Sequence, residues 1–485
     1  MEYLQSNRIS YNRTKIVATL GPASSSPEVL EEMAKAGTDV FRINFSHGDY
    51  SAVEQQVKNI REINRKLGIH TAILGDLQGP KLRIGEVENN SATLVDGAEL
   101  IFTSEKMIGN ASKVFMTYQN FPKDVKVGET VLIDDGKLVL EVKETNQKDE
   151  VRAIVRHGGI LSSKKGVNLP NTKISLPCLT EKDLKDLEFA LKMEFDWIGL
   201  SFVRSGADII ELKHLIQTLS PNSKAKVIAK IEKPEAINDI DNIVRETDGL
   251  MVARGDLGVE VPMQRVPVLQ KMLVKKCLES NKPVIIATQM MESMITNITP
   301  TRAEVNDVAN SVMDGADAVM LSGETSVGKH PAKVVEAMSK IIGNIEEEKH
   351  IYYSDRAPII SGGERNISDN ICYAATQLAK QVDASAIITM THSGYTAVRV
   401  SSYRPKANIF VFTDNYSILS QLSLVWGVRG FFYDKNISTD HTIADIKFIL
   451  KKGGYVMGGD YIINIASIPL SEKGKTNMIK LTAVE

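Results

Sequence analysis

Polar side chains that could do chemistry follow several short apolar runs of this sequence, and Lys230 and Glu232 are the clearest pair. Because successive side chains of a strand point to opposite faces, the alternation Lys-Ile-Glu directs both toward the same side. One such pair is most often a structural ion pair or a solvated strand end. Six runs end in this way, however, and the polar residues at their ends are Arg42, Asn44, Ser46 and His47; Asp76, Lys81 and Arg83; Lys230 and Glu232; Arg254, Gly255 and Asp256; Thr288 and Gln289; and Ser322 and Glu324. The repetition predicts one shared site.

The acidic members of this set suggest a metal. Glu232 and Asp256 would suit Mg²⁺, which takes few protein ligands and completes its shell with water and substrate phosphates. Lysine and arginine side chains beside them would bind an anionic substrate. The residue types therefore predict a metal-assisted reaction on a phosphate or carboxylate compound. The formal net charge of −2, without a long block of one sign, does not favour a nucleic acid or a membrane surface as partner.

Eight short apolar runs supply the strands that must position these residues. They cover residues 15–20, 40–45, 71–75, 197–200, 226–230, 249–253, 283–287 and 318–321. Helical patterns alternate with them, as is typical of parallel βαβ units. Eight units predict an α/β fold of the closed (β/α)8 TIM barrel type, in which reactive residues gather at the carboxyl ends of the strands. An open, doubly wound parallel sheet is the alternative, because alternation alone does not distinguish the two.

The alternation is interrupted once and resumes after a linker. Residues 82–168 carry short strand patterns and turn signals without a long helix, which predicts an inserted β-barrel lid domain. The stretch 352–366 contains Pro, Ser and a Gly pair and is typical of a linker. We therefore expect the barrel in residues 1–81 and 169–350, the lid in 82–168, and a C-terminal α/β domain in 366–485.

The cysteines and the N-terminal residues bear on the compartment. Cys178, Cys277 and Cys372 are odd in number and far apart, which favours neither a zinc ribbon nor a disulfide framework. The first residues lack the apolar core of a signal peptide, and no run of about 18 apolar residues follows. We expect a cytoplasmic protein without a membrane span.

Longer motifs surround the predicted strand ends. They cover residues 14–22, 42–48, 76–80, 164–170, 229–232, 251–258, 287–294, 300–310 and 321–325, among them RINFSHG, ATQMMESM and PTRAEVNDVAN. Together they resemble the pyruvate kinase family over essentially the whole chain. The resemblance implies transfer of a phosphoryl group from phosphoenolpyruvate to ADP, then protonation of the enolate to pyruvate. It also implies a barrel with a lid after the third strand, a C-terminal regulatory domain and a homotetramer.

The resemblance implies roles for the residues that would contact phosphoenolpyruvate. Arg42 would bind the phosphate, and Lys230 would neutralise charge on the transferring phosphoryl group and on the enolate. Glu232 and Asp256 would bind Mg²⁺, with Mn²⁺ as a substitute. The backbone N–H groups of Gly255 and Asp256 would hold the substrate carboxylate together with the side chain of Thr288.

Further positions match the family's proton relay and nucleotide site. Thr288, Ser322 and Glu324 would form the relay, with water as the final proton donor to carbon. The positions that match the nucleotide side are Asn44, His47, Arg83 and Lys165, the last of which would reach in from the lid.

The monovalent-cation site of the family is altered in this sequence. Its matching positions are Asn44, Ser46, Asp76 and Leu77, but a threonine normally follows the aspartate. Lys81 stands where the family normally has a glutamate. A lysine there would place a tethered ammonium in the same neighbourhood as the ion, so we expect no requirement for K⁺. The alternative is that Lys81 is a solvated loop charge and that K⁺ still binds.

A loop in the C-terminal domain matches the family's effector site. Its residues are Thr391, His392, Ser393, Gly394 and Thr396, which follow an apolar strand and offer hydroxyl and N–H groups to a phosphate. His392 stands where some members responsive to fructose 1,6-bisphosphate carry a lysine, so the identity of the effector stays open. A plain strand–helix turn without a ligand is the alternative.

Two other function classes compete with phosphoryl transfer. A metal-dependent barrel aldolase or lyase could use the same lysine and carboxylates on an enolate, but it gives no reason for Arg83, Lys165 and the lid. A non-catalytic metabolite sensor could keep the fold, but the intact catalytic set argues against it. Formation of pyruvate from phosphoenolpyruvate and ADP would separate all three.

Overall fold

The centre of the molecule is a closed barrel of eight parallel strands. The structure is a computed structural model and describes residues 11–46, 49–353, 365–435, 438–468 and 476–485. In barrel order the strands are β1 (Lys15–Thr19), β16 (Ala318–Leu321), β15 (Val284–Ala287), β14 (Gly249–Ala253), β13 (Lys226–Ile231), β12 (Trp197–Leu200), β3 (Ala72–Asp76) and β2 (Val40–Asn44). Closure confirms the barrel and excludes the open sheet.

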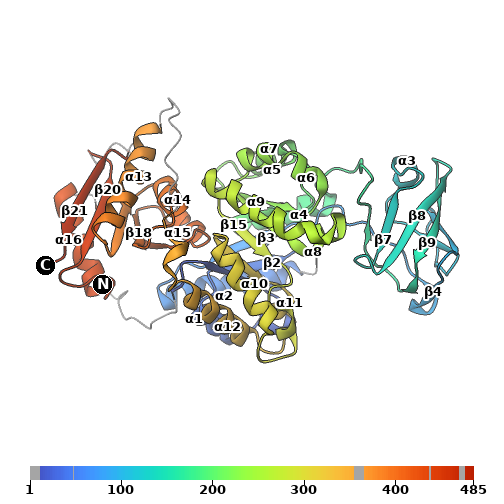
Figure 1. The fold of residues 1–485 in the computed structure, drawn as a ribbon, viewed down its shortest axis with the longest axis horizontal. Coiled ribbons are helices and arrows are strands. Elements are labelled where there is room, and N and C mark those ends of the chain that lie inside the picture. Colours follow the sequence, from blue (N-terminus) through green and yellow to red (C-terminus); the bar gives the residue numbers. More distant parts are fainter. Residues whose placement is uncertain (1–10, 47–48, 354–364, 436–437, 469–475) are drawn as a thin grey trace.

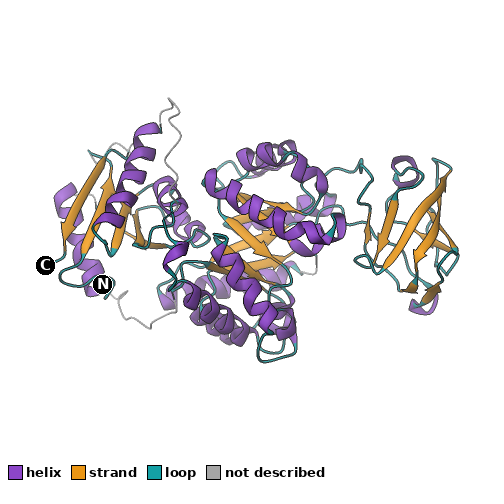
Figure 2. Ribbon diagram, in the orientation of Figure 1, coloured by secondary structure: helices purple, strands orange, loops and turns teal. Residues whose placement is uncertain are grey.

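Helices surround this barrel on its outer side (Figure 2). They are α1 (Pro27–Ala36), α2 (Tyr50–Leu67), α4 (Glu181–Lys192), α5 (Gly206–Leu219), α6 (Pro234–Asn238), α7 (Ile240–Glu246), α8 (Arg254–Glu260), α9 (Val266–Glu279), α10 (Arg302–Met313), α11 (Gly323–Ser326) and α12 (Pro331–Ile345). Their ends follow capping chemistry: the Ser26 side chain accepts from the Val29 N–H at the start of α1, and Gly37 ends that helix at φ 120°. Thr180 and Asp183 form a capping box at α4.

Strand bounds differ from the sequence prediction by single residues. The third strand runs one residue later than predicted, so Asp76 is its last residue, and the fifth strand extends to Ile231. Parallel pairing sets both limits, because Asp76 pairs with Asn44 on β2 and Ile231 pairs with Val252 on β14.

The insertion after β3 forms a separate β domain with its own apolar core. Its strands are β4 (Ala92–Leu94), β5 (Glu99–Thr103), β6 (Lys113–Phe115), β7 (Thr130–Ile133), β8 (Leu138–Thr145), β9 (Glu150–His157), β10 (Gly159–Leu161) and β11 (Val167–Asn168), with one short helix, α3 (Phe121–Asp124). Six strands form a curled sheet in the order β11-β7-β8-β9-β5-β6, and β4 pairs with β10. The predicted lid is confirmed, and it lies at one end of the molecule (Figure 1).

The C-terminal domain lies at the opposite end, with the barrel between it and the lid (Figure 1). Its sheet has the order β19 (Val428–Phe432), β18 (Asn408–Thr413), β17 (Ala386–Met390), β20 (Tyr461–Ala466) and β21 (Met478–Ala483), and only β21 is antiparallel to its neighbour. Its helices are α13 (Asn366–Gln381), α14 (Tyr395–Ser402), α15 (Tyr416–Leu422) and α16 (Thr439–Lys452). Most of the predicted linker, residues 354–364, lies outside the described residues. The exact domain limits given above stay a proposed division of the chain.

The C-terminal domain also closes the floor of the barrel. Leu424 follows α15, is buried, and belongs to the same apolar cluster as Val17, Leu74 and Trp197 of the barrel strands. Beside it the Trp426 N–H donates to Asp317 Oδ1 at 3.1 Å. The two domains therefore share one apolar layer.

The predictions about the cysteines and about membrane spans can be compared with the structure. All three cysteines are buried and form no disulfide. Among the described helices, none combines the length and apolar character that crossing a bilayer requires.

Candidate active site

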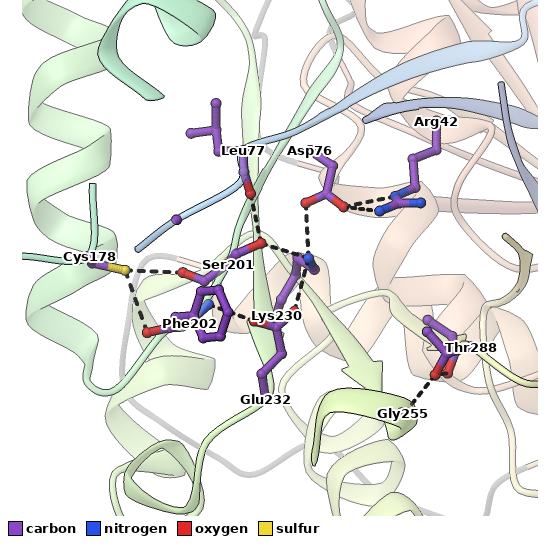
Figure 3. A network of polar contacts seen from close by, with 12 residues as sticks. Arg42, Asp76, Leu77, Cys178, Ser201, Phe202, Lys230, Glu232, Gly255 and Thr288 are labelled. Carbon is purple, nitrogen blue, oxygen red and sulfur yellow. Dashed lines mark hydrogen bonds and ion pairs between the residues drawn. The ribbon is translucent and has the colours of Figure 1, made fainter. Parts of the chain in front are cut away.

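A buried carboxylate, Asp76, connects two cations at the carboxyl ends of the barrel strands (Figure 3). Arg42 on β2 donates from Nε to Asp76 Oδ2 at 2.8 Å, and its Nη2 contacts the same oxygen. Lys230 on β13 places Nζ 3.1 Å from Asp76 Oδ1. Burial would raise the pKa of Asp76, but the charges of Lys230 and Arg42 hold that pKa below its ordinary value. The carboxylate is therefore ionised and fixes both cations.

Lys230 has three oxygen partners. Besides Asp76, its Nζ lies 2.9 Å from Glu232 Oε1 and donates to Ser201 Oγ at 2.6 Å. Burial lowers the pKa of Lys230, but the two carboxylates outweigh burial and raise it well above its ordinary value. The ammonium stays charged and points in a fixed direction.

The sequence pattern did not identify Ser201, although it directly follows the fourth strand, β12. Its hydroxyl donates to the Leu77 carbonyl at 2.7 Å, so it faces Lys230 with a lone pair. No polar end was predicted for strand β12. The polar residue directly after this strand was the signal that could have identified Ser201.

Glu232 and Asp256 form an acidic pair beside this lysine. Glu232 is buried, and its Oε2 accepts the Phe202 N–H at 2.8 Å. Burial raises the pKa of Glu232, Lys230 opposes that shift, and the negative charge of Asp256 adds to it. Two carboxylates that repel each other, Glu232 buried and Asp256 partly exposed, fit a divalent cation, because the cation removes the repulsion. The residues present therefore fit Mg²⁺.

Thr288 and Gly255 form a tight contact between β15 and α8. The Gly255 N–H donates to Thr288 Oγ1 at 2.7 Å, and a Cβ at Gly255 would lie 3.3 Å from that oxygen, so a glycine suits the position. Thr288 and Gln289 have φ of 69° and 55°, a region that residues other than glycine rarely adopt. Arg254 supports this backbone by donating to the Thr288 carbonyl at 2.8 Å and to Asp307 Oδ1 at 2.6 Å. Strain of this kind is typical of ligand-binding turns.

Ser322 and Glu324 follow β16. Glu324 is buried and holds two backbone groups, the Ser322 N–H at 2.6 Å and the Met291 N–H at 3.1 Å. Ser322 Oγ is buried and has no hydrogen-bond partner among the described residues. Glu324 thus orients the loop. Of the two residues, Ser322 has the polar group that could form a hydrogen bond to a ligand or a water.

Two of the four predicted nucleotide residues, Arg83 and Lys165, lie at the base of the lid. Arg83 donates to the Lys164 carbonyl at 3.0 Å, and Lys165 Nζ lies 2.9 Å from Asp134 Oδ1. The Ile84 N–H donates to the Lys165 carbonyl at 3.0 Å, so Arg83 and Lys165 share one edge of the lid. Asn44 Oδ1 accepts the Ser46 N–H at 3.0 Å. His47 lies outside the described residues.

A cleft separates this lid edge from the barrel mouth. Its lining comes from both domains and includes Lys81, Asp135, Asn168, Phe202, Lys233 and Asp256. Because Asp256 lines it, a ligand in the cleft would contact this member of the acidic pair and the lid together.

Comparison with known proteins identifies the family. The family model of the pyruvate kinase barrel domain matches residues 11–335, and that of the pyruvate kinase alpha/beta domain matches residues 369–482. The chain belongs to the pyruvate kinase family. It is 44% identical to a pyruvate kinase of Corynebacterium efficiens over 96% of this chain and 97% of that protein. It is 41% identical to that of Geobacillus stearothermophilus over 97% of this chain and 80% of that protein.

A solved structure of the family has the same fold. It is a pyruvate kinase from Cryptosporidium parvum, with a TM-score of 0.91 and 34% sequence identity, and the match covers 100% of this chain and 99% of the other. The comparisons support neither the aldolase or lyase alternative nor the sensor alternative.

The positions that match the family's monovalent-cation site are occupied by contacts within the protein. Asp76 holds Arg42 and Lys230, the Leu77 carbonyl accepts from Ser201, and the Asn44 side chain accepts from its own loop. Lys81 is exposed and lines the cleft that Asp256 also lines.

The predicted effector loop is the turn between β17 and α14. Gly394 has φ 79°, and its N–H donates to Thr391 Oγ1 at 3.0 Å. His392 Nδ1 lies 2.9 Å from Asp414 Oδ1. A cavity of about 360 Å³ lies beside the loop and is lined by Arg365, Thr391, His392, Ser393, Tyr395, Thr396 and Thr413, among others. The structure therefore places Thr391, His392, Ser393 and Thr396 around one cavity, and Gly394 is not among its lining residues.

Proposed function

We propose that the barrel mouth transfers the phosphoryl group of phosphoenolpyruvate to ADP and then protonates the enolate to give pyruvate. The observation that carries the proposal is the fixed ammonium of Lys230, held between Asp76, Glu232 and Ser201. A charge held in place before the reaction needs no reorganisation when negative charge develops opposite it.

Each cation has its own task in this proposal. Arg42 binds the phosphate, because its guanidinium offers several donors that suit phosphate oxygens. Lys230 contacts the bridging oxygen, where negative charge grows as the bond to phosphorus breaks and a bond to the terminal phosphate oxygen of ADP forms. Glu232 and Asp256 would hold Mg²⁺, which when bound neutralises charge on the phosphate oxygens.

The strained turn at Thr288 receives the substrate carboxylate. The N–H groups of Gly255 and Asp256 start helix α8, and the Gly255 N–H is held by Thr288 Oγ1. A carboxylate that replaces this contact would accept charge-assisted hydrogen bonds from both groups. The hydroxyls of Thr288 and Ser322 then orient the water that delivers a proton to the enolate carbon, and Glu324 positions their loop.

ADP binds in the cleft under the lid. Arg83 and Lys165 supply positive charge from the lid side, and Asn44 and His47 supply polar groups from the barrel side. The coordinates support this arrangement because Arg83 and Lys165 share one lid edge. Lys81 substitutes for the monovalent cation, so we propose that K⁺ is not required.

A phosphorylated effector binds the cavity beside Thr391, His392, Ser393, Gly394 and Thr396. The Arg365 guanidinium lies 4.4 Å from the centre of the Tyr395 ring and adds positive charge to that cavity. The homotetramer and the cytoplasmic location that the family implies are part of the same proposal, and sedimentation of the purified protein tests the first.

The decisive experiment is an assay of the purified chain with phosphoenolpyruvate, ADP and MgCl₂, coupled to pyruvate reduction. We expect pyruvate to form in proportion to enzyme. Absence of pyruvate from a folded preparation would overturn the proposal.

A further inference from the structure

A second pair of opposite charges lies next to the two metal carboxylates. Lys233 directly follows Glu232, and Glu260 lies one helical turn after Asp256 on the same face of α8. The Lys233 ammonium donates to Glu260 Oε1, and both residues are buried, with exposed fractions of 7% and 5%. This ion pair therefore joins the same two elements that carry Glu232 and Asp256.

The lid contacts the same oxygen. Asn168, the last residue of strand β11 in the lid, donates from Nδ2 to Glu260 Oε1 at 2.8 Å. The other oxygen, Oε2, is buried without a hydrogen-bond partner among the described residues. Within the described part of the chain, Lys233 and Asn168 thus orient the carboxylate, which joins the end of β13, helix α8 and the lid.

Lys233 also lies near Phe202, a residue that holds the Glu232 carboxylate. Its ammonium lies 5.8 Å from the centre of the Phe202 ring, and the Phe202 N–H holds Glu232 Oε2. Phe202 has φ 54°, so this backbone is constrained. A shift of Lys233 would therefore disturb Glu232 in two ways. It would move the neighbouring residue of the chain, and it would move Phe202, whose N–H holds the Glu232 carboxylate.

We propose that Glu260 is a positioning residue that sets the separation of Glu232 and Asp256, and that Asn168 makes this separation depend on the position of the lid. The inference rests on the proposed function of these two carboxylates. Mg²⁺ demands nearly ideal geometry, with ligand distances of about 2.0–2.1 Å. Residues that orient metal ligands typically change metal affinity by about 10- to 100-fold when they are replaced.

The first test is Glu260→Gln in the full chain, with Mn²⁺ binding measured without substrates by electron paramagnetic resonance of the free ion. We expect a Kd about tenfold above that of the wild type, in line with other residues that orient metal ligands. Glu235→Gln is the matched control, because Glu235 lines the same cleft and no ion pair of Glu235 is seen among the described residues. A Glu260→Gln Kd within twofold of wild type would overturn the proposal.

A second variant separates positioning from folding. Glu260→Gln leaves the buried ammonium of Lys233 without its charge partner, which is strongly destabilising. The double variant Lys233→Met, Glu260→Met removes both charges, so we expect its Tm to return toward that of the wild type. Its Mn²⁺ affinity should nevertheless stay low. Recovery of wild-type Mn²⁺ affinity in the double variant would contradict a positioning role.

The lid contact is tested with Asn168→Ala. We expect the Mn²⁺ Kd, measured without substrates, to stay within twofold of wild type. The KM for ADP should rise about fivefold, because the lid loses its contact with helix α8, which carries Asp256. An unchanged KM for ADP would refute the lid link. Mn²⁺ binding is measured without turnover, so a wild-type chain that forms no pyruvate would refute the proposed function and leave the Mn²⁺ readouts of the Glu260 variants interpretable.

Discussion

Asp76 and Lys230 form a buried ion pair, with 3.1 Å between Oδ1 and Nζ. The other oxygen of Asp76 holds Arg42, so one carboxylate fixes the two cations of the proposed substrate site relative to each other. From the sequence, Asp76 was assigned only to the monovalent-cation site. Its contacts indicate a second task, which is to preorganise positive charge.

Replacing Lys230 with methionine should abolish phosphoryl transfer. We expect kcat to fall at least a hundredfold, about 3 kcal/mol, as when other preorganised donors are removed. Far-ultraviolet circular dichroism should show a folded protein. A kcat within a few-fold of wild type would refute the role of Lys230.

The same variant should show a pH-dependent loss of stability. Without Lys230 the pKa of Glu232 rises further, so the folded state holds a proton that the unfolded state has lost. The Tm deficit should therefore grow as the pH rises above the ordinary pKa of a glutamate, and a deficit independent of pH would contradict this.

Activity should not depend on K⁺. The oxygens of Asn44, Asp76 and Leu77 already accept from protein donors, which leaves them poorly disposed to bind an ion. The measurement titrates KCl into the assay at constant ionic strength set with tetramethylammonium chloride. The variant Leu77→Thr, Lys81→Glu should become activated by K⁺. Strong activation of the wild type by K⁺ would contradict the proposal that Lys81 takes the place of the ion. An activity of the variant that does not change with K⁺ would also contradict it.

Ser393→Asp should abolish the response to a phosphorylated effector. A carboxylate beside the proposed phosphate position repels the ligand by like charge. The KM for phosphoenolpyruvate should respond to fructose 1,6-bisphosphate, another sugar phosphate or AMP in the wild type and stay constant in the variant. Ser91→Asp, at an exposed lid position, controls for the added charge. No response of the wild type to any of these compounds would reject the effector site.

Asp196→Asn should stabilise the protein more at pH 8 than at pH 5. Burial raises the pKa of Asp196 to about 7, although the Ile73 N–H donates to its Oδ2 at 2.8 Å. Between the ordinary pKa and this value the folded state holds the proton, so stability falls as pH rises through this window. Asparagine cannot ionise and removes the loss. Thermal unfolding at several pH values checks this, and a Tm difference that does not change with pH would disprove it.

The barrel could be predicted from the sequence because each strand is a short apolar run and six of the eight runs have polar ends. This local pattern also identified Lys230, Glu232 and Asp256 as neighbours, since the carboxyl ends of parallel strands meet at one mouth. It could not identify Asn168 and Glu260 as partners, because a contact between residues far apart in sequence leaves no local pattern. Nor could short lid strands specify their order, because their patterns are alike.

The position of Leu424 bears on whether the chain could lose its C-terminal domain during evolution. The side chain that completes the barrel floor comes from a part of the chain about a hundred residues beyond the last barrel strand. A descendant that discarded the C-terminal domain would expose Trp197 and its apolar neighbours to water, at a cost in stability that scales with the uncovered area. A chain that lacks the C-terminal domain is therefore expected to have a less stable barrel, whether or not an effector binds.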